Sequence, residues 1–150
     1  MIFKFVWVGR TKEKSWKALQ EDYLKRLSHF VRCEVVELKD PASGETVESE
    51  GNRILAALNP SSLVCLLDVS GKQINSPELA LQIEKWQNGG IKEVTFAIGG
   101  ASGVSQKVAK RADFMLSLSF LTFTHDMARV VLLEQLYRAY TIIKGFPYQK

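Results

Sequence analysis

Five short, nearly continuous apolar segments, separated by stretches with helical spacing, constrain the fold of this chain most strongly. The apolar segments lie at residues 1–8, 33–38, 62–69, 93–100 and 113–119. Near-continuous apolar strands are typical of parallel sheets buried on both faces, whereas strands with one solvent-exposed face alternate apolar and polar residues. Strict alternation of strands with helices indicates the same architecture. We therefore predict an α/β fold with a mostly parallel sheet and helices on both faces.

The segments between the apolar runs carry helix signals. An apolar stripe that recurs every three or four residues predicts helices over 13–30 and from Met127 onward. Ser76 can cap a third helix over 77–88, with Pro77 at its first position. Shorter helices are predicted at 53–58 and 105–112, and a polar loop or helix start is predicted at 40–52.

Composition limits the class of protein. The 150 residues suit one domain spanning 1–150, and a net charge of +4 favours an anionic partner. No run reaches 18 apolar residues and the start lacks the features of a signal peptide, so we expect no membrane partner and a cytoplasmic location. Cys33 and Cys65 lie in apolar runs without a CxxC pattern, which predicts buried free thiols.

Ligands of open parallel sheets bind beyond the carboxyl ends of the strands, which directs attention to the loops after Asp68, Ile98 and Ser119. The second of these loops, IGGASGVS, contains three glycines, but Ala101 interrupts the dinucleotide-binding fingerprint. This disfavours a nicotinamide-dependent oxidoreductase. The segment SGKQ at 70–73 lacks the upstream glycine of a phosphate-binding loop, and the two histidines lack metal-ligand spacing, so we expect no metal.

The segment from Leu116 to Tyr140 changes from strand-like alternation to helical spacing near Thr124. Asp126 suits the first turn of a helix, but His125 and Arg129 are placed against the helix dipole. Two interpretations remain open. His125 caps the helix locally and Arg129 pairs with Asp126, or both side chains serve a functional site.

Several motifs, in order and spacing, resemble one known family. They are LLDVSGK, FAIGGASG, LSLSFLTFTHDMARVVLLEQLYRAYTIIKG and the final PY. Together they make the whole chain similar to the RlmH family of SPOUT-class enzymes. Members of that family use S-adenosylmethionine to methylate N3 of a pseudouridine in 23S ribosomal RNA. The resemblance implies an acceptor in helix 69 of the large subunit, on the assembled ribosome.

The resemblance also implies a C-terminal trefoil knot, a rare exception to the usual connection rules, and a homodimer. The final helix carries apolar residues around much of its circumference, which independently suggests a partner subunit. These residues are Val130, Val131, Leu132, Leu133, Leu136, Tyr137, Tyr140, Ile142 and Ile143. The expected cofactor-binding residues are Leu67, Gly99, Leu118, Ser119, Phe120, Leu121, Thr122 and Phe123.

Three residues are expected to carry the reaction. His125 would accept or relay the proton of the pyrimidine, and Arg129 would face the RNA and stabilise the negative charge that develops on the ring. Tyr148, in a tail expected to be mobile, would stack on the acceptor base, with Lys150 on phosphate. The family usually has proline before this histidine and a histidine after this tyrosine, whereas this chain has Thr124 and Gln149. A non-catalytic RNA-binding α/β module is the alternative hypothesis.

Overall fold

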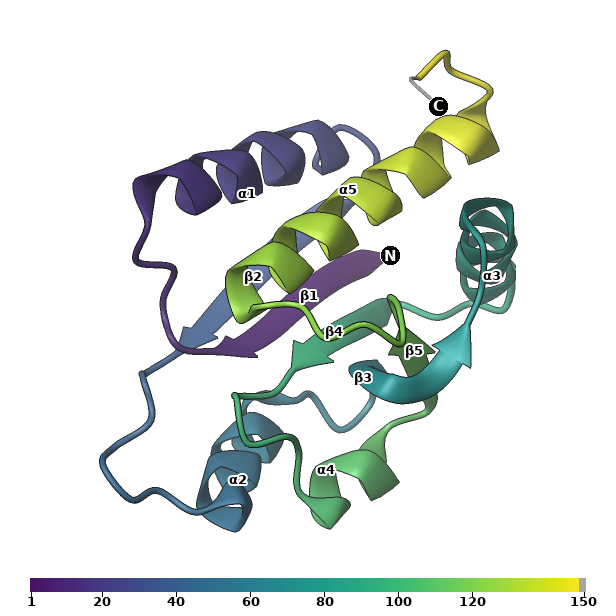
Figure 1. Cartoon of the computed structure of the whole chain (residues 1–150). Helices are drawn as coiled ribbons and strands as arrows, with labels where there is room; N and C mark the ends of the chain where they lie inside the picture. Colours follow the sequence, from purple (N-terminus) through teal and green to yellow (C-terminus); the bar gives the residue numbers. More distant parts are fainter. Residues whose placement is uncertain (149–150) are drawn as a thin grey trace.

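The computed structural model describes residues 1–148, in which strands and helices alternate strictly along the chain (Figure 1). The strands are β1 (Ile2–Val8), β2 (Arg32–Leu38), β3 (Leu63–Gln73), β4 (Glu93–Ile98) and β5 (Phe114–Ser117). The helices are α1 (Lys14–Leu27), α2 (Val47–Ala57), α3 (Ser76–Asn88), α4 (Gln106–Arg111) and α5 (His125–Lys144). No helix within 1–148 is both long and apolar enough to cross a membrane.

The five strands form one parallel sheet in the order β2-β1-β4-β3-β5, which confirms the predicted fold class. Helices α1, α3 and α5 cover one face, and α2 and α4 cover the other (Figure 1). Both faces are therefore buried. This explains why the strands show no simple alternation of apolar and polar residues.

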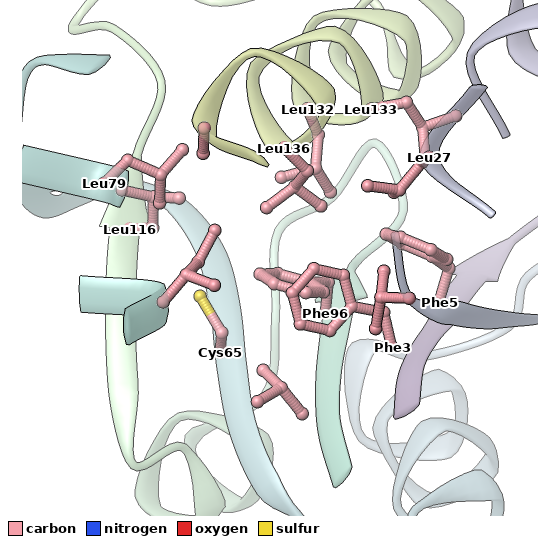
Figure 2. Close-up of a cluster of buried hydrophobic side chains, with 14 of the residues drawn as sticks. Phe3, Phe5, Leu27, Cys65, Leu79, Phe96, Leu116, Leu132, Leu133 and Leu136 are labelled. Carbon is pink, nitrogen blue, oxygen red and sulfur yellow. The ribbon is translucent and has the colours of Figure 1, made fainter. Parts of the chain in front are cut away.

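Two separate apolar clusters lie against the two faces of the sheet. Under α1, α3 and α5, Phe3 and Phe96 meet edge to face with ring centroids 5.1 Å apart, beside Leu133 and Leu136 (Figure 2). On the opposite face, the neighbouring strand residues pack against α2 and α4; the buried members are Val6, Val8, Ile54, Leu58, Val64, Leu66, Ala97 and Val108. Successive strand residues enter opposite clusters because side chains alternate along a strand. Cys65 is buried in the first cluster and Cys33 is partly buried beside it, both as free thiols, as predicted for Cys65.

The apolar surface of α5 is largely covered within the chain itself. Helix α5 lies over the sheet with α1 on one side and α3 on the other (Figure 1). Leu132, Leu133, Leu136 and Tyr140 are each at most 1% exposed. The inference that the width of this apolar surface requires a second subunit is therefore wrong for these four residues, because α5 has neighbours on three sides.

Helix α2 begins six residues earlier than the predicted Arg53. Thr46 adopts an extended conformation and its hydroxyl accepts a hydrogen bond from the backbone N–H of Ser49 at 3.1 Å, so it caps the helix. The polar composition of this segment left a loop or a helix start open, and the second alternative holds from Val47 onward. Its polar residues form the first turns of a helix that packs on the sheet only through its later residues.

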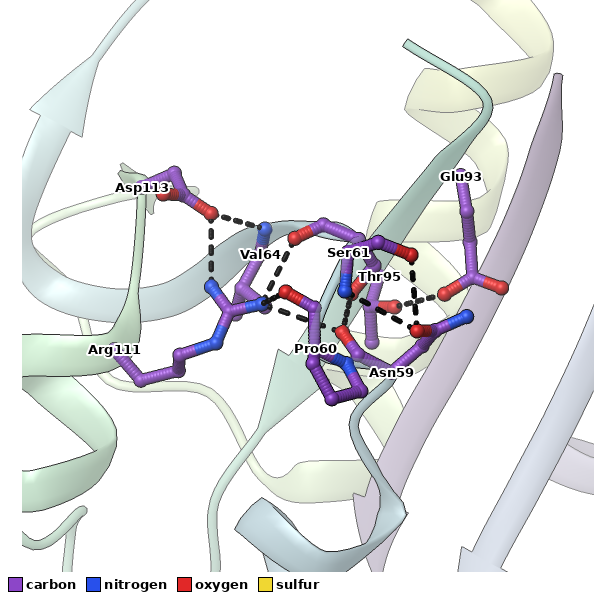
Figure 3. A network of polar contacts seen from close by, with 9 residues as sticks. Asn59, Pro60, Ser61, Val64, Glu93, Thr95, Arg111 and Asp113 are labelled. Carbon is purple, nitrogen blue, oxygen red and sulfur yellow. Dashed lines mark hydrogen bonds and ion pairs between the residues drawn. The ribbon is translucent and has the colours of Figure 1, made fainter.

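A polar network fixes the amino ends of β3 and β5 (Figure 3). Arg111 donates to the carbonyl of Ser62 at 2.9 Å and pairs with Asp113 at 3.0 Å. The carboxylate of Asp113 accepts from the backbone N–H of Val64 at 2.8 Å. These bonds set the start of the β3–β5 pair, at the edge of the sheet opposite the candidate site described below.

Strand β3 continues past the predicted loop after Asp68, as far as Gln73. Its register with β5 shifts between Leu67 and Lys72, so the intervening residues form an irregular segment within the strand. Gly71 allows the two strands to approach. A Cβ at this position would lie 2.8 Å from the carbonyl carbons of Met115 and Leu116.

We expect Gly71→Ala to lower the free energy of unfolding by about 1–3 kcal/mol, because the added methyl group meets rigid backbone rather than a movable side chain. Urea unfolding monitored by circular dichroism measures this change. Lys72→Ala is the matched control, since Lys72 is exposed and surface substitutions usually change stability by less than about 0.5 kcal/mol. Equal stability of the two variants would contradict the steric argument.

Candidate functional site

A pocket of about 550 Å³ lies at the carboxyl edge of the sheet, beyond the ends of β4 and β5 and beside the irregular segment of β3. This volume falls within the range of small-molecule sites. The loops predicted after Ile98 and Ser119 contribute to it, whereas the segment predicted as a loop after Asp68 is part of β3 and contributes Val69. The lining residues come from the middle of β3, where its register with β5 shifts (Leu67, Asp68, Val69), from β4 and its loop (Ile98, Gly99, Gly100, Ala101, Gly103, Val104) and from the region of β5 and α5 (Leu116, Leu118, Ser119, Leu121, Thr122, Phe123, Thr124, His125, Ala128).

Most of the expected cofactor-binding residues lie together in this lining. They are Leu67, Gly99, Leu118, Ser119, Leu121, Thr122 and Phe123, and His125 lies beside them. Phe120 is not among the lining residues and is 73% exposed. Sequence reasoning missed most of the glycine loop, although the motif IGGASGVS had marked it. A motif identifies the loop, but the fold decides which of its residues face the pocket.

The lining offers few charged side chains. Asp68 and His125 are its ionisable residues, and it contains no lysine or arginine. The carboxylate of Asp68 accepts a hydrogen bond from the backbone N–H of Ser70 at 2.9 Å. A ligand in this pocket would therefore meet apolar side chains and backbone groups rather than a cluster of cations. Within residues 1–148, no three His, Cys, Asp or Glu side chains are grouped so that they could hold a metal ion.

Short local hydrogen bonds shape the connection from β5 to α5. The hydroxyl of Ser117 donates to the carbonyl of Ser119 at 3.0 Å, and the Ser119 hydroxyl accepts from the backbone N–H of Leu121 at 3.0 Å. Thr124 caps α5 by accepting from the backbone N–H of Met127 at 3.4 Å. The cap places His125 at the first position of α5, where its side chain is partly buried and lines the pocket.

Arg129 lies beneath the site, and its side chain does not face solvent. It is 1% exposed. Its Nη2 donates to the carbonyls of Val8 at 2.7 Å and Gly9 at 2.8 Å, and its Nη1 donates to the hydroxyl of Thr11 at 3.0 Å. Its guanidinium lies 4.9 Å from the centroid of the Trp7 ring. The expectation that Arg129 faces the RNA is therefore wrong for this structure, because the side chain is used to bind the end of β1.

The environment of Arg129 has a clear electrostatic cost. Burial lowers the pKa of the guanidinium below its ordinary value, and the carboxylates of Asp126, Glu37 and Asp40 oppose this effect. The pairing with Asp126 expected from the sequence exists, but it is long, at 3.8 Å. The short bonds to backbone carbonyls favour the charged form more directly. Arg129 thus ties the β1–α1 connection to the first turn of α5, one turn from His125.

Tyr148 is packed on the second half of α5, in contrast to the expected free tail. Its ring meets Tyr137 edge to face at 4.9 Å, and the guanidinium of Arg138 lies 4.6 Å from its centroid. Its hydroxyl donates to Glu134 at 3.3 Å. Burial, followed by the interactions with Tyr23 and Glu134, raises the pKa of Tyr148, so the phenol remains protonated. Tyr148 does not line the pocket. Gln149 and Lys150 lie outside the described residues.

Comparison with known proteins identifies the family. The family described as "Predicted SPOUT methyltransferase" matches residues 1–149. The chain belongs to this SPOUT methyltransferase family. It is similar to the ribosomal RNA large subunit methyltransferase H of Carboxydothermus hydrogenoformans, with 44% identity over 159 aligned residues and 100% of both chains covered. A relative of the same name from Halothermothrix orenii is 45% identical over 152 residues, which cover 95% of this chain and 96% of the relative. The resemblance found in the motifs is confirmed.

We expect Arg129→Ala to lower the free energy of unfolding of this SPOUT protein by about 3 kcal/mol, since it leaves two buried carbonyls and the Thr11 hydroxyl without their donor. An arginine near an exposed helix start would instead be neutral or slightly unfavourable. Thermal and urea unfolding distinguish the two cases. Arg26→Ala is the control, because Arg26 forms an exposed pair with Asp22 on α1, and such pairs contribute at most about 1 kcal/mol.

Proposed function

We propose that this chain transfers a methyl group from S-adenosylmethionine to N3 of a pseudouridine in 23S ribosomal RNA, in helix 69 of the assembled ribosome. The observation that carries the proposal is the pocket at the carboxyl edge of the sheet, which is lined by β3, by the loop after β4 and by the connection from β5 to α5, and includes His125. Membership of the SPOUT family, the names of the relatives and the net charge of +4 support a methyltransferase that acts on RNA in the cytoplasm.

The residues of the pocket fit S-adenosylmethionine. Leu67, Gly99 and the lining residues of the segment 118–123, which exclude Phe120, would hold it through apolar contacts and backbone hydrogen bonds. The absence of lysine and arginine from the lining suits a ligand with a positively charged sulfur, and Asp68 adds a negative charge. When bound, this cofactor supplies an electrophilic methyl group.

The chain's own contribution to the chemistry is proton transfer and charge stabilisation. N3 of the pyrimidine becomes nucleophilic as its proton leaves, and negative charge then spreads to the ring carbonyls. His125 is the basic side chain of the lining and would accept or relay that proton. The first backbone amides of α5, next to His125, would face the developing charge. Arg129 would act by holding the β1–α1 connection against this helix end, without touching the RNA.

We also propose a homodimer and a C-terminal trefoil knot, as the family resemblance implies. Near the pocket, Phe120 and Leu121 are each 73% exposed and Val69 is 49% exposed, an apolar surface that a second subunit would cover. Tyr148 binds at Glu134, nine residues from His125, which is about 13 Å along a helix. Tyr148 therefore reaches an acceptor base only if the tail leaves α5 or serves the pocket of the second subunit.

Ribosomes from cells that lack this protein, incubated with the purified protein and S-adenosylmethionine, should gain a methylated pseudouridine detectable by mass mapping. We expect His125→Ala to lower the rate by roughly 10²–10⁴-fold, the usual contribution of a positioned proton acceptor. His29→Ala is the matched control, since His29 is exposed after the end of α1. The absence of saturable S-adenosylmethionine binding would favour the non-catalytic RNA-binding module, and a wild-type rate for His125→Ala would contradict its role.

We expect Gly99→Val to weaken cofactor binding without unfolding the domain, because the added side chain would clash with another residue of the same loop. A Cβ on Gly99 would lie 2.5 Å from Cγ1 of Val104 and 3.3 Å from the carbonyl oxygen of Gly103. The milder Gly99→Ala should therefore regain most of its affinity in a Val104→Ala background, where the clashing methyl group is gone. Calorimetric titration with S-adenosylmethionine measures both variants. A double variant no better than Gly99→Ala alone would mean that the added group meets the cofactor itself.

A further inference from the structure

Glu50, in the first turn of α2, lies directly against the glycine loop that forms one wall of the pocket. Its carboxylate Oε1 accepts a hydrogen bond from the backbone N–H of Gly100 at 2.8 Å. The residue is 8% exposed, although most glutamates lie at the surface. A buried carboxylate is costly unless it is hydrogen-bonded, and bonds from backbone amides to a carboxylate are among the stronger ones.

The contact is complementary in shape as well as in charge. A Cβ on Gly100 would lie 2.5 Å and 2.7 Å from the two carboxylate oxygens of Glu50. Glycine at position 100 therefore allows the carboxylate to reach the backbone. Position 99 is constrained differently, since a Cβ there would meet Val104 within the loop. The two adjacent glycines thus serve different contacts, one within the loop and one with α2.

The next residue of α2 contacts the other end of the same loop. A Cβ on Gly51 would lie 2.3 Å from Oγ and 2.9 Å from Cβ of Ser105. Ser105 caps α4 by accepting a hydrogen bond from the backbone N–H of Val108 at 3.3 Å. Two consecutive residues of α2 therefore touch Gly100 and Ser105, between which lie three pocket-lining residues, Ala101, Gly103 and Val104.

We propose that Glu50 is a positioning residue for cofactor binding: its carboxylate holds the loop 100–104 in the conformation that the cofactor requires, although Glu50 is not part of the pocket lining. This inference rests on the proposed binding of S-adenosylmethionine in the pocket. Ordering the loop before binding removes an entropic cost that the ligand would otherwise have to offset. The effect of Glu50 should therefore appear in cofactor affinity and leave the chemical step nearly unchanged.

The test compares Glu50→Ala, Glu50→Gln and the control Glu48→Ala, which removes an exposed glutamate from the same helix. We expect Glu50→Ala to raise the dissociation constant and the KM for S-adenosylmethionine by roughly 10–100-fold, the usual value of a hydrogen bond to a charged group. The kcat for ribosome methylation at saturating cofactor should stay near the wild-type value. Glu50→Gln keeps an acceptor for the Gly100 N–H and should recover most of the affinity, and Glu48→Ala should match the wild type.

Hydrogen exchange of the cofactor-free protein gives a second readout that does not depend on the proposed function. The Gly100 amide should exchange faster in Glu50→Ala than in the wild type or Glu50→Gln, while the amides of β1 and β4 remain protected. Unchanged exchange at Gly100, affinity equally weak in both Glu50 variants, or faster exchange throughout the sheet would each overturn the positioning role. If the wild type binds no S-adenosylmethionine, the proposed function fails, and the exchange data alone decide whether Glu50 holds the loop.

Discussion

Burial of both faces of a parallel sheet is the constraint on which the rest of this structure depends. Once α1, α3 and α5 cover one face and α2 and α4 the other, polar backbone groups remain to be satisfied at the strand ends as well as along the outer edges of β2 and β5. At the carboxyl edge this happens in two ways. The carbonyls of Val8 and Gly9 accept hydrogen bonds from the buried guanidinium of Arg129, whereas the loops after β4 and β5, together with β3, surround a pocket.

The glycines near this edge allow close packing, and they do not form the motif of a dinucleotide-binding loop. Gly71 lets β3 approach the backbone of β5, Gly99 avoids Val104, and Gly100 admits the carboxylate of Glu50. Each position faces a different neighbour from a different part of the chain. This explains why the pattern IGGASG lacks the spacing of a dinucleotide-binding loop and still forms one wall of a ligand site. The spacing reflects what each glycine packs against.

Two of the three expected catalytic residues lie elsewhere than the sequence suggested, and for the same physical reason. Arg129 and Tyr148 were interpreted from their chemistry, which suits RNA. Arginine and tyrosine, however, suit buried backbone carbonyls and aromatic neighbours equally well. Arg129 donates hydrogen bonds to Val8, Gly9 and Thr11, which precede it in the chain by 118 to 121 positions. No local sequence pattern could reveal these partners. His125 lies in the pocket as expected, because its place depends on the local cap at Thr124 and on the end of β5.

Sequence patterns alone predicted the alternation of strands and helices, the parallel sheet buried on both faces and the loops after Ile98 and Ser119, because periodicity and turn residues act over a few neighbouring residues. The sequence also carried the motifs that mark the family. Tertiary packing, by contrast, sets the approach of Gly71 to β5, the burial of Arg129 and the contact of Glu50 with Gly100. These features depend on the strand order β2-β1-β4-β3-β5, which brings together residues far apart in the chain. The free energy of a buried charge depends on such distant partners, whereas the propensity of a segment to form a helix or a strand does not.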